Sequence, residues 1–295
     1  MLVVIADYQV LTDRETATHL DEHVLGLIAD HLAAGIDPDE ATIFTHSAIA
    51  ALNQLLLPLL SLVTVPELQR NPTVKDEITH SGRSSVSGLM FTYPAHQAAD
   101  ILFCKANLVP VGQDQLPHLE LTRTLARRFN ERHAPLFAEP DALLSAAPLL
   151  LGTDGTKMSK SRGNAIALRA DADETARLIR GAKTDSQRHI TYEPDSRPEV
   201  ASLLRLAALC TGTDPHTLAA DIGPGGAAEL KRVVTEAVNE HLAPLRAARQ
   251  NYAADQAGLR RILTEGNHRA TEIAETTLQQ VRAAMGTTYS ASPSR

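Results

Sequence analysis

The sequence predicts an α/β protein, in which a doubly wound parallel sheet is followed by an all-helical segment. Short, continuously apolar runs alternate with helical patterns up to about residue 170, an order typical of parallel strands covered on both faces. Beyond that point the strand pattern fades, and helical patterns broken by Gly and Pro continue. We therefore expect an α/β domain over residues 1–170, a helical domain over 171–290 and a frayed tail over 291–295.

The first strand–helix–strand unit lies at the start of the chain. LVVIADYQVL (residues 2–11) predicts a buried strand, and residues 12–15 have the spacing of a capping box. Apolar residues recur at helical spacing over residues 20–32, and Gly35 ends that helix. ATIFTHS (residues 41–47) predicts the next strand, so this segment is expected to form a βαβ unit.

The remaining elements of the first domain follow the same alternation. A Ser- and Gly-rich loop is expected over residues 81–88, and a helix that starts at Pro94 comes after it. LVPVG (residues 108–112) predicts another buried strand, followed by a helix with Leu125 on its apolar face. PLLLG (residues 148–152) predicts the last strand, which leads directly into a basic loop.

The composition argues against several classes of function. A formal net charge of −7 argues against non-specific nucleic-acid binding, and 3% aromatic residues with no Trp argue against a base-stacking surface. The longest apolar stretch, residues 55–65, is too short to cross a bilayer, so no membrane association is expected. Cys104 and Cys210 lack CxxC spacing and are interpreted as packing residues of a cytoplasmic protein.

Two motifs are better explained by structure than by chemistry. HLDEH (residues 19–23) matches the H-x-x-E-H pattern of a zinc peptidase family, but it lies on a helix whose other face is apolar. We interpret it as a solvated helix face and expect no metal site. GPGG (residues 223–226) is too short for a dinucleotide-binding motif and is interpreted as a turn.

Three polar residues, Tyr93, Gln97 and Asp100, fall on one stripe of a helix at positions i, i+4 and i+7. A phenol, an amide and a carboxylate among alanines suit a small pocket that binds hydrogen-bond donors. A solvated stripe on an amphipathic helix explains the same spacing. Asp100 would need a partner if it were buried. The cluster Gln113–Asp114–Gln115 follows a strand, at the edge where open α/β sheets bind ligands.

GTKMSKSRGN (residues 155–164) is the strongest indication of function. Lys157 and Lys160 are three residues apart, with a hydroxyl residue between them and Gly on both sides. A lysine places a mobile point charge on a flexible stem, which suits a polyphosphate whose charge is redistributed during a reaction. The alternative is a solvated loop with chance lysines.

KMSKS, at residues 157–161, resembles the signature loop of class I aminoacyl-tRNA synthetases. The surrounding segments resemble the tryptophanyl enzymes of that class; they are residues 6–14, 68–78, 92–102, 108–130 and 152–166. The resemblance covers nearly the whole chain and implies a Rossmann-like catalytic domain that lacks its first strand. AKTDS (residues 182–186) and the helices beyond it resemble the family's anticodon-binding domain.

This resemblance implies a ligase that activates L-tryptophan with ATP and transfers it to tRNA(Trp). Mg²⁺ would accompany ATP, bound mainly through the phosphates, and the family predicts a homodimer. Because positioning and charge stabilisation can supply most of the catalysis, no side chain need act as a nucleophile.

The resemblance also implies roles for individual residues. Lys157 and Lys160 would be catalytic, holding the leaving phosphates. The implied ATP-binding residues are Gly112, Gln113, Asp114, Lys157, Met158, Ser159, Lys160 and Ser161. The implied tryptophan-binding residues are Gln9, Tyr93, Gln97, Asp100, Val109, Val111 and Gln115, with Asp100 accepting the indole N–H. A site built to bond that N–H would discriminate against phenylalanine by about 10⁴ or more.

The chain departs from the family in one major respect. The second class I signature, a HIGH-type histidine pair on a Gly-rich turn, has no counterpart in residues 1–295. Without the family's first strand, LVVIADY and LVPVG would flank a vacant strand position about 10 Å wide. Three explanations are open: the chain begins at an internal Met of a longer protein, which we favour; it is a degenerate paralogue; or it pairs the two strands directly. Gln113 also stands where an acidic residue is common.

Two other functions are considered beside the tryptophan–tRNA ligase. A Tyr-x₃-Gln-x₂-Asp helix could also serve the phenol of a tyrosyl-tRNA ligase, although LVPVGQDQLPHLELTR favours tryptophan. The missing HIGH segment raises the alternative of a non-catalytic paralogue that binds tryptophan or partners a synthetase.

Overall fold

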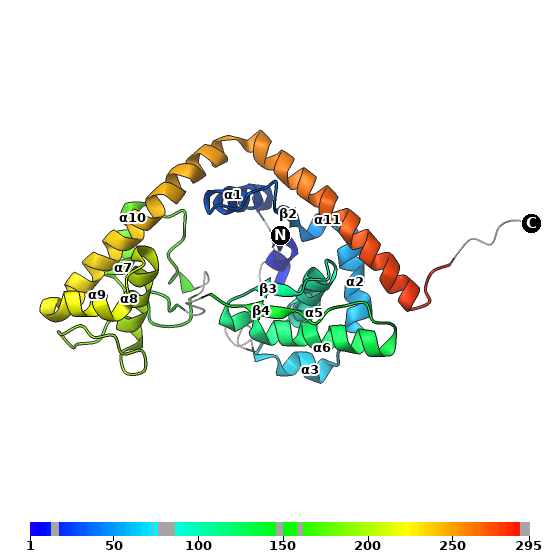
Figure 1. The fold of residues 1–295 in the computed structure, drawn as a ribbon, viewed down its shortest axis with the longest axis horizontal. Coiled ribbons are helices and arrows are strands. Elements are labelled where there is room, and N and C mark those ends of the chain that lie inside the picture. The colour runs from blue at the N-terminus through cyan, green and yellow to red at the C-terminus, as the bar shows by residue number, and fades with distance from the viewer. Residues whose placement is uncertain (13–17, 73, 76–85, 146–149, 159–161, 290–295) are drawn as a thin grey trace, which may run out of the picture. The chain divides into compact units, whose positions relative to one another are not determined.

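The computed structural model describes residues 1–12, 18–72, 74–75, 86–145, 150–158 and 162–289. Its contacts group the chain into two compact units (Figure 1). Unit 1 comprises Met1–Ile28, Ile36–Ala146 and Gln256–Arg295, and unit 2 comprises Ala29–Gly35 and Ala147–Asp255. The units begin and end elsewhere than the expected domains of 1–170 and 171–290, whose boundaries stay a prediction.

Unit 1 contains two pairs of parallel strands. Strand β1 (Leu2–Ile5) pairs with β2 (Thr42–Thr45), and helix α1 (Leu20–Ala33) comes between them in the chain, which confirms the predicted βαβ unit. Strand β3 (Leu108–Pro110) pairs with β4 (Asp141–Leu143), with helix α6 (Leu116–Arg132) between them. Within the described residues the two pairs are separate sheets, and LVVIADY does not pair directly with LVPVG.

Three local predictions are wrong. The predicted last strand, PLLLG, is no strand over its described residues, because Leu151 makes only an isolated antiparallel bridge with Lys157. The first strand ends at Ile5, and residues Asp7–Thr12 form the 3₁₀ helix η1. Helix α5 spans Gly88–Leu102 and contains Pro94 in its interior, because the Ser87 hydroxyl caps the Met90 N–H at 3.1 Å and starts the helix earlier.

Two further expectations fall partly or wholly outside the described residues. The capping box at residues 12–15 lies outside them apart from Thr12, which ends η1. The same applies to residues 81–85 of the Ser- and Gly-rich loop, whose last residue, Gly88, begins α5.

The core of unit 1 is formed by β2 and the helices around it. Buried residues of α2 (Ala50–Leu60), α5 and α6 pack with those of the last helix, α11 (Gln256–Ala284). Its largest fully buried members are Phe44, Ile49, Leu52, Leu55, Leu59, Leu102, Phe103, Leu125 and Phe129. A short helix, α3 (Val65–Arg70), packs beside α5 and begins with a capping box formed by Thr64 and Glu67.

Helix α11 lies directly against β2 (Figure 1). A Cβ added to Gly266 would lie 1.9 Å from the backbone oxygen of Ile43, so only glycine permits this approach. The side-chain oxygen of Asn267 accepts the N–H of Thr45 at 3.0 Å. This contact satisfies a donor at the end of β2 that would otherwise lack a partner.

Unit 2 is helical, as predicted for most of its length. Helices α7 (Ala172–Arg180), α8 (Pro198–Thr211), α9 (Pro215–Ile222) and α10 (Gly226–Ala254) surround a core that includes Ile179, Leu204, Leu230 and Val234. The predicted turn at GPGG contains the 3₁₀ helix η5 (Gly223–Gly225). No helix among the described residues is long and apolar enough to span a membrane.

Candidate active site

Helix α5 carries the predicted polar stripe, and Tyr93 is its buried end. The side-chain oxygen of Asn71 accepts the Val74 N–H, which turns the Asn71 NH₂ group toward His118 Nδ1 at 3.3 Å. Nδ1 of His118 therefore accepts, so its Nε2 carries the hydrogen and donates to the Tyr93 hydroxyl at 3.1 Å. This buried contact between α5 and α6 fixes the position of the phenol.

Gln97 links the stripe to the residues that follow β3. Its Nε2 donates to Oε1 of Gln115 at 3.2 Å, and Gln115 Nε2 donates to Oδ2 of Asp114 at 3.1 Å. These partners belong to η3 (Gln113–Gln115), which Gly112 precedes as N-cap. Strand β3 and the loop after it also hold Val109 and Val111, which are half-buried. The structure thus brings together the two polar clusters that the sequence indicated separately.

Gln9 and Gln113 are predicted site residues of unit 1 that lie outside the hydrogen-bonded cluster of Gln97, Asp114 and Gln115. Gln9 is half-buried on η1, a segment that packs against α5, and its backbone N–H donates to the Ala6 oxygen at 3.0 Å. Gln113 is exposed at the start of η3.

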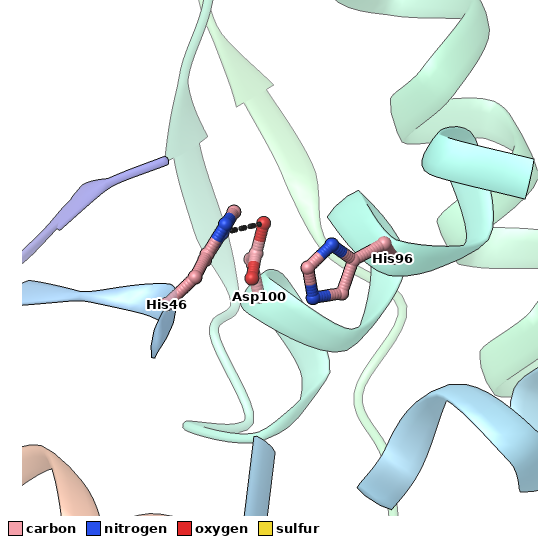
Figure 2. A group of neighbouring side chains, drawn as sticks. All are labelled: His46, His96 and Asp100. Carbon is pink, nitrogen blue, oxygen red and sulfur yellow. Dashed lines mark ion pairs between the residues drawn. The ribbon is translucent and has the colours of Figure 1, made fainter. Parts of the chain in front are cut away.

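Asp100 is buried beside a histidine that sequence reasoning missed (Figure 2). His46 follows β2 in the 3₁₀ helix η2 (His46–Ala48), and its Nε2 lies 2.8 Å from Asp100 Oδ2. His96 belongs to α5, and the centroid of its ring lies 4.6 Å from the centroid of the His46 ring. Burial lowers the pKa of His96 below its ordinary value, although the nearby charge of Asp100 acts in the opposite direction. A polar residue directly after a strand was the available signal for His46.

Asp7 lies at the corresponding end of β1. Its Oδ1 accepts the Ser47 N–H at 3.1 Å, and its Oδ2 accepts the Ser47 hydroxyl in a very short contact. Because β1 and β2 are parallel neighbours, their carboxyl ends place Asp7 and His46 at the same edge of the sheet.

The solvated-face interpretation of HLDEH (residues 19–23) is confirmed, since His19 and His23 are both exposed.

The basic loop lies in unit 2 and begins as a tight turn. Gly152 donates its N–H to the Thr156 oxygen at 2.8 Å, and Gly155 has a φ of +80°, a conformation that favours glycine. A Cβ on Gly152 would lie 2.3 Å from the side chain of Asn164, and one on Gly155 would lie 2.7 Å from that of Glu199. Both glycines are therefore required by close packing of the loop.

Asn164 and Asp154 hold the two arms of this loop together. The buried Asn164 donates from Nδ2 to Asp154 Oδ1 at 2.8 Å and to the Lys157 oxygen at 3.1 Å. Asp154 also accepts the Thr156 N–H at 2.9 Å. These hydrogen bonds lower the pKa of Asp154 below its ordinary value, and the one from Asn164 contributes most.

Lys157 and Met158 follow the turn and are both exposed. Met158 also lines a small pocket with Ile166 and Leu203, which belongs to unit 2. Ser159, Lys160 and Ser161 lie outside the described residues.

The family described as tRNA synthetases class I (W and Y) matches residues 1–243 of the chain. This chain belongs to that family of class I tRNA synthetases. The tryptophan–tRNA ligase of Streptococcus pyogenes serotype M1 is 38% identical to it over 302 residues, covering 98% of this chain and 88% of the relative. That of Treponema pallidum is 39% identical over 290 residues, covering 96% of this chain and 86% of the relative.

Solved structures of class I synthetases have the same fold. A tryptophanyl-tRNA synthetase from Mycoplasma pneumoniae superposes with a TM-score of 0.85 at 26% identity, over 96% of this chain and 87% of that one. An enzyme of the same name from Campylobacter jejuni, complexed with ADP and tryptophan, gives a TM-score of 0.76 at 27% identity, over 96% and 88%. These comparisons confirm the predicted Rossmann-like fold class with its helical C-terminal part.

Proposed function

We propose that this class I synthetase is a tryptophan–tRNA ligase, which activates tryptophan with ATP and transfers it to tRNA(Trp). The observation that carries the proposal is the buried Asp100 carboxylate on a polar stripe with Tyr93 and Gln97. This stripe belongs to a chain that is 38% identical to the tryptophan–tRNA ligase of Streptococcus pyogenes serotype M1. The curated relatives favour this function over a tyrosyl-tRNA ligase or a non-catalytic paralogue.

Asp100 is proposed to accept the indole N–H of tryptophan. Its Oδ1 is buried and has no hydrogen-bond partner in the described part of the chain, so a ligand donor would satisfy it. Gln9, Tyr93, Gln97, Val109, Val111 and Gln115 are proposed to line the same pocket. A substrate without the N–H would leave the carboxylate unpaired, which supports strong discrimination against phenylalanine.

The basic loop is proposed to bind ATP. Lys157 and Lys160 would hold the phosphates, with Met158 near the adenine and Ser159 and Ser161 as further contacts. Gly112, Gln113 and Asp114 are proposed as further nucleotide-binding residues. KMSKS contains cations and hydroxyls but no carboxylate, a donor set that fits phosphate oxygens and would leave Mg²⁺ to bind through the phosphates.

The reaction then needs no protein nucleophile. An oxygen of the tryptophan carboxylate forms a bond to the α-phosphorus, the bond from that phosphorus to the bridging oxygen breaks, and pyrophosphate leaves with the electron pair. Lys157 and Lys160 stabilise the charge that develops on the leaving phosphates. A ribose hydroxyl at the 3′ end of the tRNA next attacks the carbonyl carbon, and AMP departs.

We further propose a cytoplasmic homodimer whose helical residues 171–290 contact tRNA(Trp). Light scattering should give twice the mass of one chain. A mass equal to one chain at micromolar concentration would contradict the dimer but not the ligase activity.

ATP–pyrophosphate exchange tests the proposed function. Exchange is expected with tryptophan and not with tyrosine or phenylalanine. The assay compares the 295-residue chain with the same chain extended by its upstream reading frame, because a longer protein is one explanation for the missing HIGH segment. Exchange with tyrosine alone, or with no amino acid in either form, would contradict the proposal.

A further inference from the structure

We propose that His46 is a positioning residue for substrate recognition: it pairs with Asp100 Oδ2 and so leaves Oδ1 for the N–H of the substrate's ring. This inference rests on the proposed function, because it takes Asp100 as the acceptor of the indole N–H. It assigns a role to a residue outside the polar stripe, contributed by the end of β2 rather than by α5 (Figure 2).

The contact between the two side chains is close and buried. The His46 side chain is fully buried, that of Asp100 is 8% exposed, and the Nε2–Oδ2 distance is 2.8 Å. Two lone pairs at this distance would repel, so a proton lies between the atoms. The ring N–H deviates from the ideal line to Oδ2, so the contact is a short polar contact rather than a well-aligned hydrogen bond.

A single amide determines where the second histidine can donate. Asn53 Nδ2 donates to the backbone oxygens of His46 at 2.8 Å and Ile49 at 3.0 Å, so its Oδ1 is turned toward His96 Nε2 at 2.9 Å. Because an amide oxygen only accepts, His96 Nε2 carries the hydrogen. Burial favours the neutral ring, whose Nδ1 then holds a lone pair and cannot donate to Asp100.

His46 is therefore the group that keeps the Asp100 carboxylate in place. With Oδ2 engaged by His46 and His96 unable to donate from Nδ1, Oδ1 is buried without a partner in the described residues. A buried carboxyl oxygen in that state binds an N–H donor strongly and discriminates against a ligand without one. Loss of His46 would remove the contact to Oδ2 that holds the carboxyl group in place, and it would weaken that preference.

A divalent cation is the rival occupant of this cluster. Ligand atoms of His46, His96 and Asp100 all lie within 4.8 Å of one another, and two imidazoles with a carboxylate are a donor set that suits zinc. A nitrogen that shares a proton with a carboxylate has no lone pair for a cation, so the 2.8 Å contact favours the positioning role.

Two substitutions separate a positioning role from a merely structural one. In His46→Gln the amide nitrogen can reach the place of Nε2, whereas in His46→Asn it takes the place of Nδ1 and leaves Oδ2 without its donor. We expect His46→Asn to raise the Kd for tryptophan by about tenfold to a hundredfold and His46→Gln by less than about threefold. Because the chain contains no Trp, indole fluorescence reports the bound substrate directly.

A ligand without the N–H is the matched control. In β-(benzothiophen-3-yl)alanine sulfur replaces the indole N–H, so its Kd, measured by calorimetry, should change by less than about threefold in both variants. Equal losses for both ligands would show a structural role and overturn the inference.

The outcomes also separate this inference from the proposed function. If the unsubstituted chain binds tryptophan and His46→Asn binds it equally well, the inference alone is wrong. If neither the unsubstituted chain nor its extended form binds tryptophan, both are wrong. Stoichiometric binding of Zn²⁺ that displaces tryptophan would overturn the positioning role, because His46 and Asp100 would then be ligands of a cation.

Discussion

The backbone of Lys157 is held in place by two contacts within the loop. One is the bridge to Leu151, and the other is the hydrogen bond from Asn164 to the Lys157 oxygen. We expect Lys157→Ala to lower kcat for pyrophosphate exchange by about a hundredfold, because a cation that meets charge developing on the phosphates would be lost. Lys105→Ala is the control, since Lys105 is bonded to Gln280 in unit 1. Equal effects of the two substitutions would contradict a role for the loop in catalysis.

Single residues of the site were predictable only where the signal is local. Tyr93, Gln97 and Asp100 lie within two turns of one helix, so their spacing revealed them. His46 is far from Asp100 in the chain, and their contact depends on where η2 and α5 pack. The resemblance supplied roles for the residues of a shared motif, and it was silent on a partner outside that motif.

At the scale of elements, the ion pair between Glu67 of α3 and Arg128 of α6 predicts a pH dependence. Arg128, with smaller contributions from Thr64, lowers the pKa of Glu67 from 4.5 to about 2. The depressed pKa means that the stabilisation is fully present above pH 4.5 and is lost as the pH falls toward 2.

Glu67→Gln should therefore lower the free energy of unfolding by about 1 kcal/mol at neutral pH, a modest value because both side chains are partly exposed. The difference from the parent chain should shrink below pH 4.5, as measured by urea unfolding. Glu131→Gln, at an exposed position, should show no such trend. A difference independent of pH would exclude the ion pair as its cause.

The close approach of α11 to β2 gives a second prediction at this scale. Gly266→Ala improves helix propensity by about 1 kcal/mol, but the new Cβ would meet the Ile43 oxygen at 1.9 Å. We expect the clash to dominate and to destabilise the protein by about 2–4 kcal/mol, seen as a lower Tm. Glu265→Ala, next to it on the exposed side, is the control. An unchanged Tm for Gly266→Ala would show that α11 shifts without cost.

Elements with a clear apolar or amphipathic pattern of their own were mostly predicted correctly, and those defined by tertiary contacts were not. Strand β4 was missed because its three residues, Asp141–Leu143, show no apolar run of their own and are defined by pairing with β3. PLLLG has the composition of a strand, but Leu151 turns back toward Lys157 instead. Pro94 marked a helix start by preference, whereas the Ser87 cap places the start earlier.

For the whole molecule, we expect substitutions in the Asp100 cluster and in the basic loop to affect the binding of different ligands. Asp100→Asn should weaken tryptophan binding and leave ATP binding within about twofold, while Lys157→Ala should do the reverse. The reason is that Asp100 and its partners belong to unit 1 and the loop belongs to unit 2. Calorimetry with each ligand alone checks this, and a large effect of either substitution on both ligands would contradict it.

Helix α11 also determines when β2 can acquire its full set of contacts during synthesis on the ribosome. The segment Ala147–Asp255 supplies nearly all of unit 2 and emerges before α11, whereas the edge of β2 waits for Gly266 and Asn267. Strand β2 is thus completed by a helix that is synthesised more than 200 residues later. Until α11 is synthesised, β2 and its apolar neighbours are uncovered, and a chaperone could bind this exposed apolar surface.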